Sequence, residues 1–154
     1  MGKYVNNKCS SLYNITLCAI VLMGSLAGCK KDEPTAQEQV TKMLTSAEAW
    51  QDPIVTVDDV DQSALYTDFV ISFSNTNYTS ANGSPVWKSA GTWVFKDEMA
   101  QIMIFDGVQE VEITSISNEE LELSVQWNED TFEPGRTRSV KGKNKFKLKK
   151  KPKK

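Results

Sequence analysis

The sequence predicts an all-β protein: an antiparallel up-and-down meander of 7–8 strands, closed into a barrel and preceded by a short N-terminal helix. The first observation is a two-residue alternation of apolar and polar side chains after Trp50, clearest in LELSVQW at 121–127. The second is that short turn-forming stretches separate these runs, with no helical period between them. A parallel sheet is therefore not expected, and closure into a barrel would remove exposed strand edges.

The expected elements follow one another at short intervals. Thr35 is expected to cap a helix beginning at Ala36, with Glu38 completing a capping box. The expected strands are 54–57, 67–74, 91–95, 101–105, 108–117, 121–127 and a lysine-rich strand within 138–150. The separators are rich in Asn, Asp, Gly, Ser and Pro, and the longest of them is SNTNYTSANGSP at 74–85.

The N-terminus is typical of a secretory signal, residues 1–28. A basic start precedes the apolar run ITLCAIVLMGSLAG at 15–28, which is shorter than the roughly 20 residues of a membrane span. The four residues Leu26-Ala27-Gly28-Cys29 resemble the lipobox of bacterial lipoproteins. That resemblance implies that Cys29 is lipidated, with palmitate-like acyl chains, and becomes the mature N-terminus. A short membrane anchor and an ordinary signal peptide are the alternatives.

Residues 29–35 are expected to form a polar tether. Two or more acyl chains hold a protein firmly on a membrane, whereas one chain does so only marginally. Lys30-Lys31-Asp32-Glu33 also resembles the lysine-then-acid signal that sends some Gram-negative lipoproteins to the cell surface. The expected location is the cell envelope, anchored by lipid in the outer membrane and exposed at the surface if that signal acts.

The amino-acid composition limits the catalytic and metal-binding chemistry that the chain can carry. The chain has no histidine, so Ser-His-Asp and Cys-His catalysis are excluded. Of its 3 cysteines, Cys9 and Cys18 lie in the signal, which leaves no disulfide or cysteine metal site. The acids at 58–61 are expected to form a hairpin turn because a calcium loop needs further ligands, and Glu119-Glu120 lack the separation of a hydrolase pair. We therefore expect no enzyme, no metal and no cofactor.

A lipobox, a short helix and a meander of this spacing resemble the small lipocalin-like lipoproteins of Gram-negative bacteria. The resembling pieces are AEAWQ at 47–51, VDDVDQSALYTDFVISFS at 57–74, SAGTWVF at 89–95 and ELELSVQW at 120–127. Lipocalins open the first strand with Gly-x-Trp, whereas this chain has Glu48-Ala49-Trp50 there; Gly91-Thr92-Trp93 has the pattern but comes too late. The resemblance implies a calycin-type barrel, here residues 36–148, and no catalytic residues.

Aromatic side chains are the candidate ligand-binding residues. Trp50, Trp93 and Trp127 lie in alternating strands, so they either line a cup or pack as ordinary core. Tyr78 and Trp87 lie in turn-rich sequence and are expected to be exposed at the barrel mouth. A hollow barrel lined by tryptophan favours a small-molecule binder, and a filled barrel favours an interaction module.

Charge is distributed unevenly along the chain. All 20 acids lie between Asp32 and Glu133, whereas residues 135–154 hold 11 bases and no acid. Residues 149–154 are expected to be a basic disordered tail. This tail either contacts anionic lipid, such as the phosphates of lipopolysaccharide, or folds against the acidic body; nucleic acid is not an expected partner of an exported lipoprotein.

The sequence therefore favours a lipid-anchored envelope protein whose barrel binds a small apolar or glycan-like ligand. The alternative is a non-enzymatic interaction or structural subunit of an outer-membrane complex, with a packed barrel and an envelope protein as its partner.

Overall fold

The computed structural model describes residues 33–130 and 140–153. The signal segment, Cys29 and most of the tether lie outside these residues. The chain divides into Met1–Glu33 and Pro34–Lys154, and the described fold belongs to the second unit.

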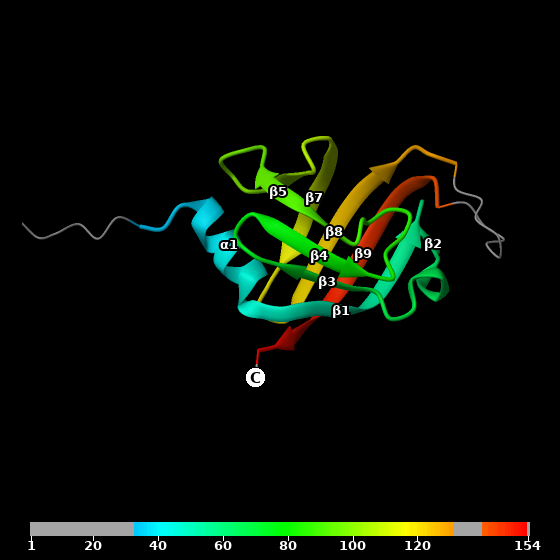
Figure 1. The fold of residues 1–154 in the computed structure, drawn as a ribbon, viewed down its shortest axis with the longest axis horizontal. Helices are drawn as coiled ribbons and strands as arrows, with labels where there is room; N and C mark the ends of the chain where they lie inside the picture. Colours follow the sequence, from blue (N-terminus) through cyan, green and yellow to red (C-terminus); the bar gives the residue numbers. More distant parts are fainter. Residues whose placement is uncertain (1–32, 131–139, 154) are drawn as a thin grey trace, which may run out of the picture. The chain divides into compact units, whose positions relative to one another are not determined.

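Nine strands form one antiparallel sheet (Figure 1). They are β1 (Ala47–Val57), β2 (Val60–Asp61), β3 (Val70–Phe73), β4 (Asn77–Ala81), β5 (Ala90–Phe95), β6 (Ile102–Phe105), β7 (Gln109–Ile116), β8 (Glu120–Trp127) and β9 (Gly142–Pro152). β2 pairs only with β1. β1 also pairs with β3, and from β3 to β9 each strand pairs with the next one along the chain. Because β1 also pairs with β9, eight strands close into a meander barrel, and the predicted fold class is confirmed.

The first and last strands of the barrel lie side by side over their whole length. Their register runs from Ala47 opposite Pro152 to Val57 opposite Asn144. On its other side β9 pairs with β8, from Glu120 opposite Lys149 to Trp127 opposite Gly142. Both ends of the described unit are therefore attached to the same three-strand wall.

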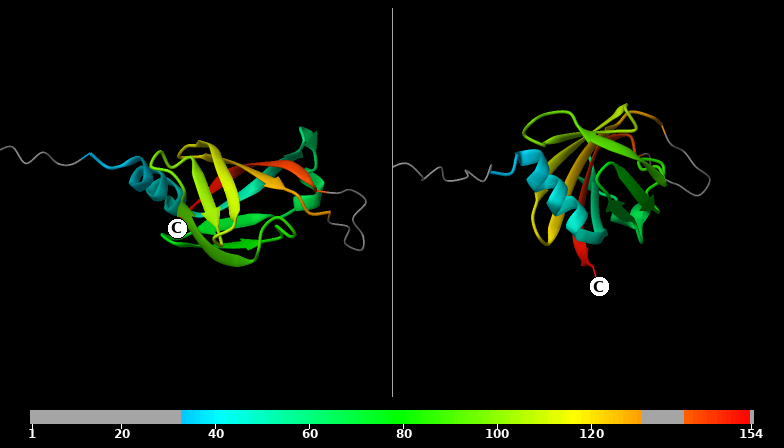
Figure 2. Two further views of the ribbon diagram at one scale, coloured as in Figure 1. Left: turned by 90° about the horizontal axis from the view of Figure 1, so that it is seen from above. Right: turned by 60° about the vertical axis from the view of Figure 1, so that its left-hand side comes forward.

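Helix α1 (Ala36–Ser46) lies across one end of the barrel (Figure 2). Thr35 accepts a hydrogen bond from the Glu38 amide, and Glu38 accepts one from the Thr35 amide, so the predicted capping box is confirmed. Leu44 is fully buried, and its carbonyl accepts a hydrogen bond from the Trp50 indole at 3.1 Å. We call this the helix end of the barrel.

The opposite end, which we call the far end, carries the termini of β8 and β9 that contain Trp127 and Asn144. The 3-10 helix η1 (Ser63–Tyr66) and the turn at 83–87 pack here, and Tyr66 and Trp87 are buried. The Gln109 side chain, at the start of β7, donates a hydrogen bond to the Val86 carbonyl and fastens this turn.

Two sequence expectations about boundaries are wrong. β4 lies inside the stretch that the sequence predicts to be one long turn. The prediction fails because only Tyr78 of the five β4 residues is buried, so that no alternation is visible. The residues expected to be a disordered tail belong to β9 as far as Pro152. They are ordered as a strand because β1 already begins at Ala47 and pairs with them.

The capping box generates the first prediction. Thr35→Ala removes the side-chain acceptor of the Glu38 amide, so we expect the free energy of unfolding to fall by about 1 kcal/mol in urea titrations. Thr35→Ser keeps the acceptor and is expected to stay close to the wild type. Equal losses in both variants would show that the cap does not hold the helix.

Candidate functional site

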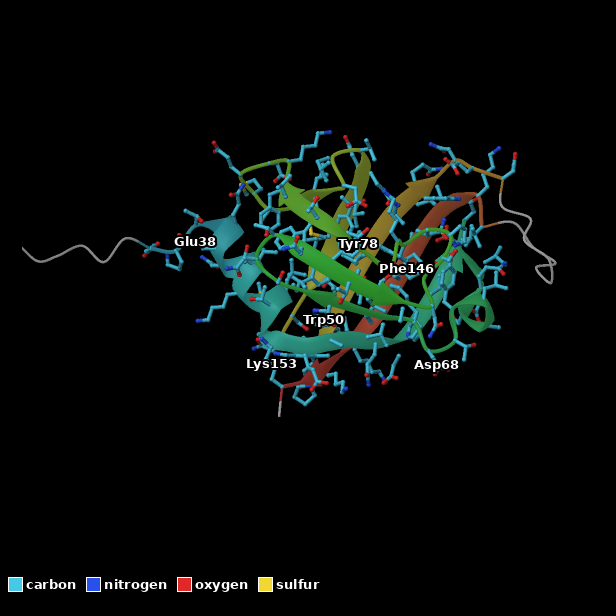
Figure 3. The ribbon with its side chains drawn as sticks, in the orientation of Figure 1. Glu38, Trp50, Asp68, Tyr78, Phe146 and Lys153 are labelled. Carbon is cyan, nitrogen blue, oxygen red and sulfur yellow. The ribbon has the colours of Figure 1, made fainter. Side chains whose placement is uncertain are left out.

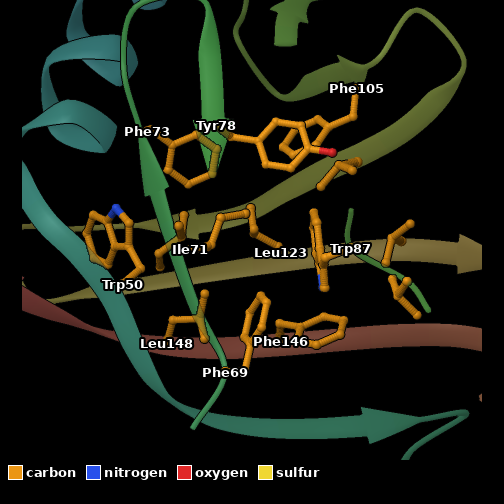
Figure 4. Close-up of a cluster of buried hydrophobic side chains, with 14 of the residues drawn as sticks. Trp50, Phe69, Ile71, Phe73, Tyr78, Trp87, Phe105, Leu123, Phe146 and Leu148 are labelled. Atoms are coloured by element: carbon orange, nitrogen blue, oxygen red, sulfur yellow. The ribbon is translucent and has the colours of Figure 1, made fainter. Parts of the chain in front are cut away.

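The barrel interior is filled by aromatic rings that come from different walls (Figure 4). The Phe146 ring, on β9, has its centre 5.0 Å from that of Tyr66, 5.4 Å from that of Phe69 and 5.3 Å from that of Trp87. The Phe105 ring, on β6, lies 4.5 Å from that of Tyr78 and 5.5 Å from that of Trp87. Such edge-to-face and tilted contacts stabilise the fold beyond simple burial of apolar area.

The expectation that Tyr78 and Trp87 are exposed at the barrel mouth is wrong, because each is only 2% exposed. Tyr78 points inward from β4, and Trp87 stacks on Phe69 where the turn folds back over the far end. A Cβ at Gly83 would lie 2.6 Å from the Phe69 ring and 2.7 Å from the Trp87 Cβ. Only glycine at position 83 therefore lets the turn place Trp87 inside the barrel. The residue pattern alone does not reveal this packing.

The remaining predicted tryptophans occupy two different settings. Trp50 is fully buried and donates its indole hydrogen to Leu44. Trp93 is 2% exposed, and its indole nitrogen donates to the carbonyls of Ser74 and Asn77 at 3.0 and 3.2 Å. These two side chains are satisfied parts of the core. Trp127 is half-buried at the far end.

Within the described residues, three buried polar atoms at the far end have no hydrogen-bond partner: the indole nitrogens of Trp87 and Trp127 and the Asn144 carboxamide oxygen. Asn144 is fully buried, and its amide nitrogen donates to the Val140 and Gly142 carbonyls. A buried polar group without a partner costs about 1–3 kcal/mol, so three at one end call for a physical cause.

Strand register places these groups in one region. Asn144 lies opposite Val125 and Trp127 opposite Gly142, so Asn144 and Trp127 are diagonal neighbours on the inner face. Phe146, the next inward residue along β9, contacts the Trp87 ring. We call Trp87, Trp127 and Asn144 the far-end polar set. Asn144 is not among the predicted site residues, although its inward position follows from its two-residue spacing from Phe146.

Tyr78 has a structural role beside the β6–β7 turn, which contains Asp106. Its hydroxyl donates to Asp106 at 3.1 Å, while the Thr92 amide donates to the other Asp106 oxygen at 2.9 Å. The Lys88 ammonium, 3.1 Å away, forms an ion pair with the same carboxylate. A Cβ at Gly91 would lie 2.2 Å from an Asp106 oxygen, so glycine makes room for this carboxylate.

The pKa values of this group follow from its contacts. The Thr92 hydrogen bond is the largest cause that lowers the pKa of Asp106, and Lys88 and Tyr78 add to it against the effect of burial. Burial, and then the Asp106 charge, raises the pKa of Tyr78. The carboxylate joins β4, β5 and the end of β6, and the Tyr78 hydroxyl is not free to bind a ligand.

The acids at 58–61 form the turn that the sequence predicts. Asp58 and Asp59 have φ of 48° and 65° between β1 and β2, and Asp59 pairs with Lys145 at 2.6 Å. Asp58 accepts a hydrogen bond from the Lys143 amide. Within residues 33–130 and 140–153, no group of three or more His, Cys, Asp or Glu side chains is arranged to hold a metal ion.

The wall of the barrel is incomplete between β1 and β3. These strands are in register only at Trp50 and Ile71, because β1 is irregular between Gln51 and Ile54. A depression of about 360 Å³ lies here, lined by Gln51, Asp52, Pro53, Ser63, Tyr66, Thr67, Asp68, Phe69 and Val70. Because Tyr66 and Phe69 both contact Phe146, this depression borders the aromatic cluster of the far half.

Comparison of the chain with protein-family models, with curated proteins and with solved structures gave no significant match. The barrel is therefore shown by the structure alone, and the lipocalin-like and lipoprotein resemblances stay predictions. No helix within the described residues is long and apolar enough to cross a membrane.

The Asp106 contacts generate the second prediction. We expect Asp106→Asn to lower the free energy of unfolding by about 1–2 kcal/mol at neutral pH, because charged hydrogen bonds to Thr92 and Tyr78 are weakened. The folded pKa lies below the ordinary value of about 3.9, so this stabilisation is present above that pH and is lost as pH falls through the folded pKa.

The measurement is urea unfolding of both proteins from neutral to acidic pH. The gap between them is expected to close on acidification. Lys88→Gln is the control and is expected to cost less, because the lysine side chain is 68% exposed. A gap independent of pH would show that the Asp106 charge does not contribute.

Proposed function

We propose that this chain is a non-enzymatic lipoprotein of the bacterial cell envelope whose barrel binds a small ligand at its far end. The observation that carries this proposal is the far-end polar set: three buried polar atoms without partners among the described residues, next to the contact between the Trp87 and Phe146 rings. Such a setting is typical of ligand sites, in which apolar walls supply most of the contact area and a few polar groups fix orientation.

The chemistry of the set defines the ligand class. Two indole N–H groups donate, and the Asn144 oxygen accepts. A hydroxyl group can accept from an indole and donate to a carboxamide at the same time. The rings of Phe69, Trp87 and Phe146 favour an apolar body or the face of a sugar. We therefore infer a neutral, small ligand that is largely apolar or glycan-like and carries at least one hydroxyl.

The depression between β1 and β3 is the candidate route to this region. It has polar side chains at its sides, including Gln51 and Ser63, and it is also lined by Tyr66 and Phe69. Rotation of these two rings would open a path to Phe146 without breaking a strand pair, since β1 and β3 are already separated here.

Anchoring at Cys29 rests on the sequence. Leu26-Ala27-Gly28-Cys29 follows a basic and then apolar segment, and the polar residues 30–35 separate it from α1. A domain held by acyl chains on such a leash would present its binding site at an envelope surface, and Lys30-Lys31-Asp32-Glu33 favours the outer one.

A filled interior supports a second candidate function. Rings from β6, β9 and the far-end turn contact one another across the barrel, which is the arrangement expected of a packed scaffold. In that case the outer surface would bind an envelope protein. On the outer face, Val94 is 58% exposed and lies opposite Ile104.

The third prediction tests the anchor. Cys29→Ala removes the only thiol that the lipobox offers for acylation, so we expect the protein to leave the membrane fraction and to lose labelling by radioactive palmitate. Cys18→Ala, within the signal segment, is the matched control and should change neither. A Cys29→Ala protein that stays fully membrane-bound would contradict the lipoprotein proposal.

The fourth prediction tests the ligand. Native mass spectrometry of residues 30–154, purified from an envelope extract, should show an added mass that disappears on denaturation. Asn144→Leu and Trp87→Phe are expected to lose this mass, because each removes a polar partner of the ligand.

Trp93→Phe is the matched control, since its indole nitrogen already has two partners inside the protein. It should destabilise the fold and retain the ligand. A clean apo mass in the wild type would instead support the packed interaction module, whose partner would then be sought by crosslinking.

A further inference from the structure

Lysines along β9 differ sharply in whether they have an acidic partner. From the far end inward, Lys143 pairs with Glu112 at 3.7 Å, Lys145 with Asp59 at 2.6 Å, and Lys147 with Glu120 and Glu122 at 3.0 and 3.3 Å. Near the strand's end only Lys151 is paired, with Glu48 at 2.6 Å. The acidic body therefore neutralises β9 over most of its length.

Lys149, Lys150 and Lys153 form no ion pair with any carboxylate in the described part of the chain; we call them the terminal lysine cluster. Lys149 and Lys153 are exposed, and Lys150 is half-buried. The Lys150 ammonium donates a hydrogen bond to Ser46, the last residue of α1, at 2.8 Å. This cluster is an unneutralised positive charge on a domain whose body is acidic.

The cluster lies at the helix end of the barrel. Pro152 is opposite Ala47, the residue that follows α1, and Figure 3 shows Lys153 near the junction of α1 and β1. Two acids lie beside the cluster: the Glu119 carbonyl accepts a hydrogen bond from the Lys150 amide, and Glu120 lies opposite Lys149. With Glu119 and Glu120, Lys149 and Lys150 line a depression of about 400 Å³. Glu120 is already paired with Lys147, so the cationic groups outnumber the unpaired acid.

The chain between the lipobox and the barrel is short. Six residues separate Cys29 from Ala36, so the leash reaches at most about 25 Å when fully extended. The 11 residues of α1 span about 16 Å across the helix end. A lipid on Cys29 would therefore keep the whole helix end, with its lysines, within reach of the bilayer surface.

We propose that the terminal lysine cluster binds the anionic phospholipid head groups of the membrane that holds the Cys29 anchor, so that the helix end faces the bilayer. The orientation rests on the proposed anchoring, but the lipid contact itself does not. An ammonium group near an anionic lipid surface adds to membrane attraction within a Debye length. Lys149 and Lys150 in β9, and Lys153 just after it, are not neutralised by any carboxylate of the described residues. The far-end polar set then points away from the membrane.

The experiment uses residues 30–154, which contain the closed barrel, its core and its capping helix, and lack the lipidated cysteine. Sedimentation with vesicles of phosphatidylcholine alone is compared with vesicles that also contain phosphatidylglycerol. We expect binding only to the anionic vesicles, with affinity falling as salt is raised. The triple variant Lys149→Gln, Lys150→Gln, Lys153→Gln is expected to bind at least about tenfold more weakly.

The matched control is Lys143→Gln, Lys145→Gln, Lys147→Gln, which removes the same charge from paired positions on the same strand. It should change vesicle affinity less than about twofold. Because Lys150 also bonds Ser46, an arginine version of the terminal triple variant is added and is expected to keep binding. Thermal unfolding of each variant confirms that the barrel is intact.

Equal losses in the two glutamine variants, or equal binding to both kinds of vesicle, would overturn the proposal. If the vesicle experiment fails but Cys29→Ala protein is released from membranes, the lipid contact is contradicted and the proposed anchor is retained. If vesicle binding depends on the terminal lysine cluster but Cys29→Ala has no effect in cells, the lipid contact is supported and the proposed anchor is contradicted.

Discussion

The pairing of β1 with β9 is the constraint on which the rest of the structure depends. Each strand has 11 residues, and together they close a sheet that the other pairings leave as an open meander. Without this pairing, the inward side chains of β9, Asn144, Phe146 and Leu148, would have no opposite wall. Closure is also the most non-local step of the fold, since it joins residues about a hundred positions apart, and the entropy of that loop must be offset by the ring contacts of Phe146.

Closure is achieved at the cost of an irregular wall. β1 shifts register against β9 between Gln51 and Ile54, where Asp52 has a φ of 54° and Pro53 has no amide hydrogen to donate. Because of this irregularity, β1 can pair with β3 in its first half and with β2 at its end. The depression beside Tyr66 and Phe69 is the direct consequence, so the candidate route into the barrel and the closure of the barrel have the same origin.

Much of the fold could be predicted from the sequence because it depends on local patterns. The capping box at Thr35 and the alternation in β8 are visible in a few residues, and both are confirmed. β4 could not be found, since one buried Tyr78 among polar neighbours gives no period. The burial of Trp87 depends on the space left at Gly83, and the end of β9 depends on a partner about a hundred residues earlier. The far-end polar set escaped for the same reason: its members come from three separate segments.

The two ends of the barrel differ in how their polar groups are satisfied, and this difference supports a different proposed binding role for each end. At the helix end the indole of Trp50 has a partner inside the protein, and Trp93 is likewise satisfied by the nearby β3–β4 turn. At the far end the indoles of Trp87 and Trp127 have no partner among the described residues. Conversely, Lys143 and Lys145 toward the far end are ion-paired, whereas at the helix end Lys151 is paired but Lys149 and Lys150 form no ion pair within the described residues. Both asymmetries are explained if one end binds a small hydroxylated ligand and the other binds a membrane surface.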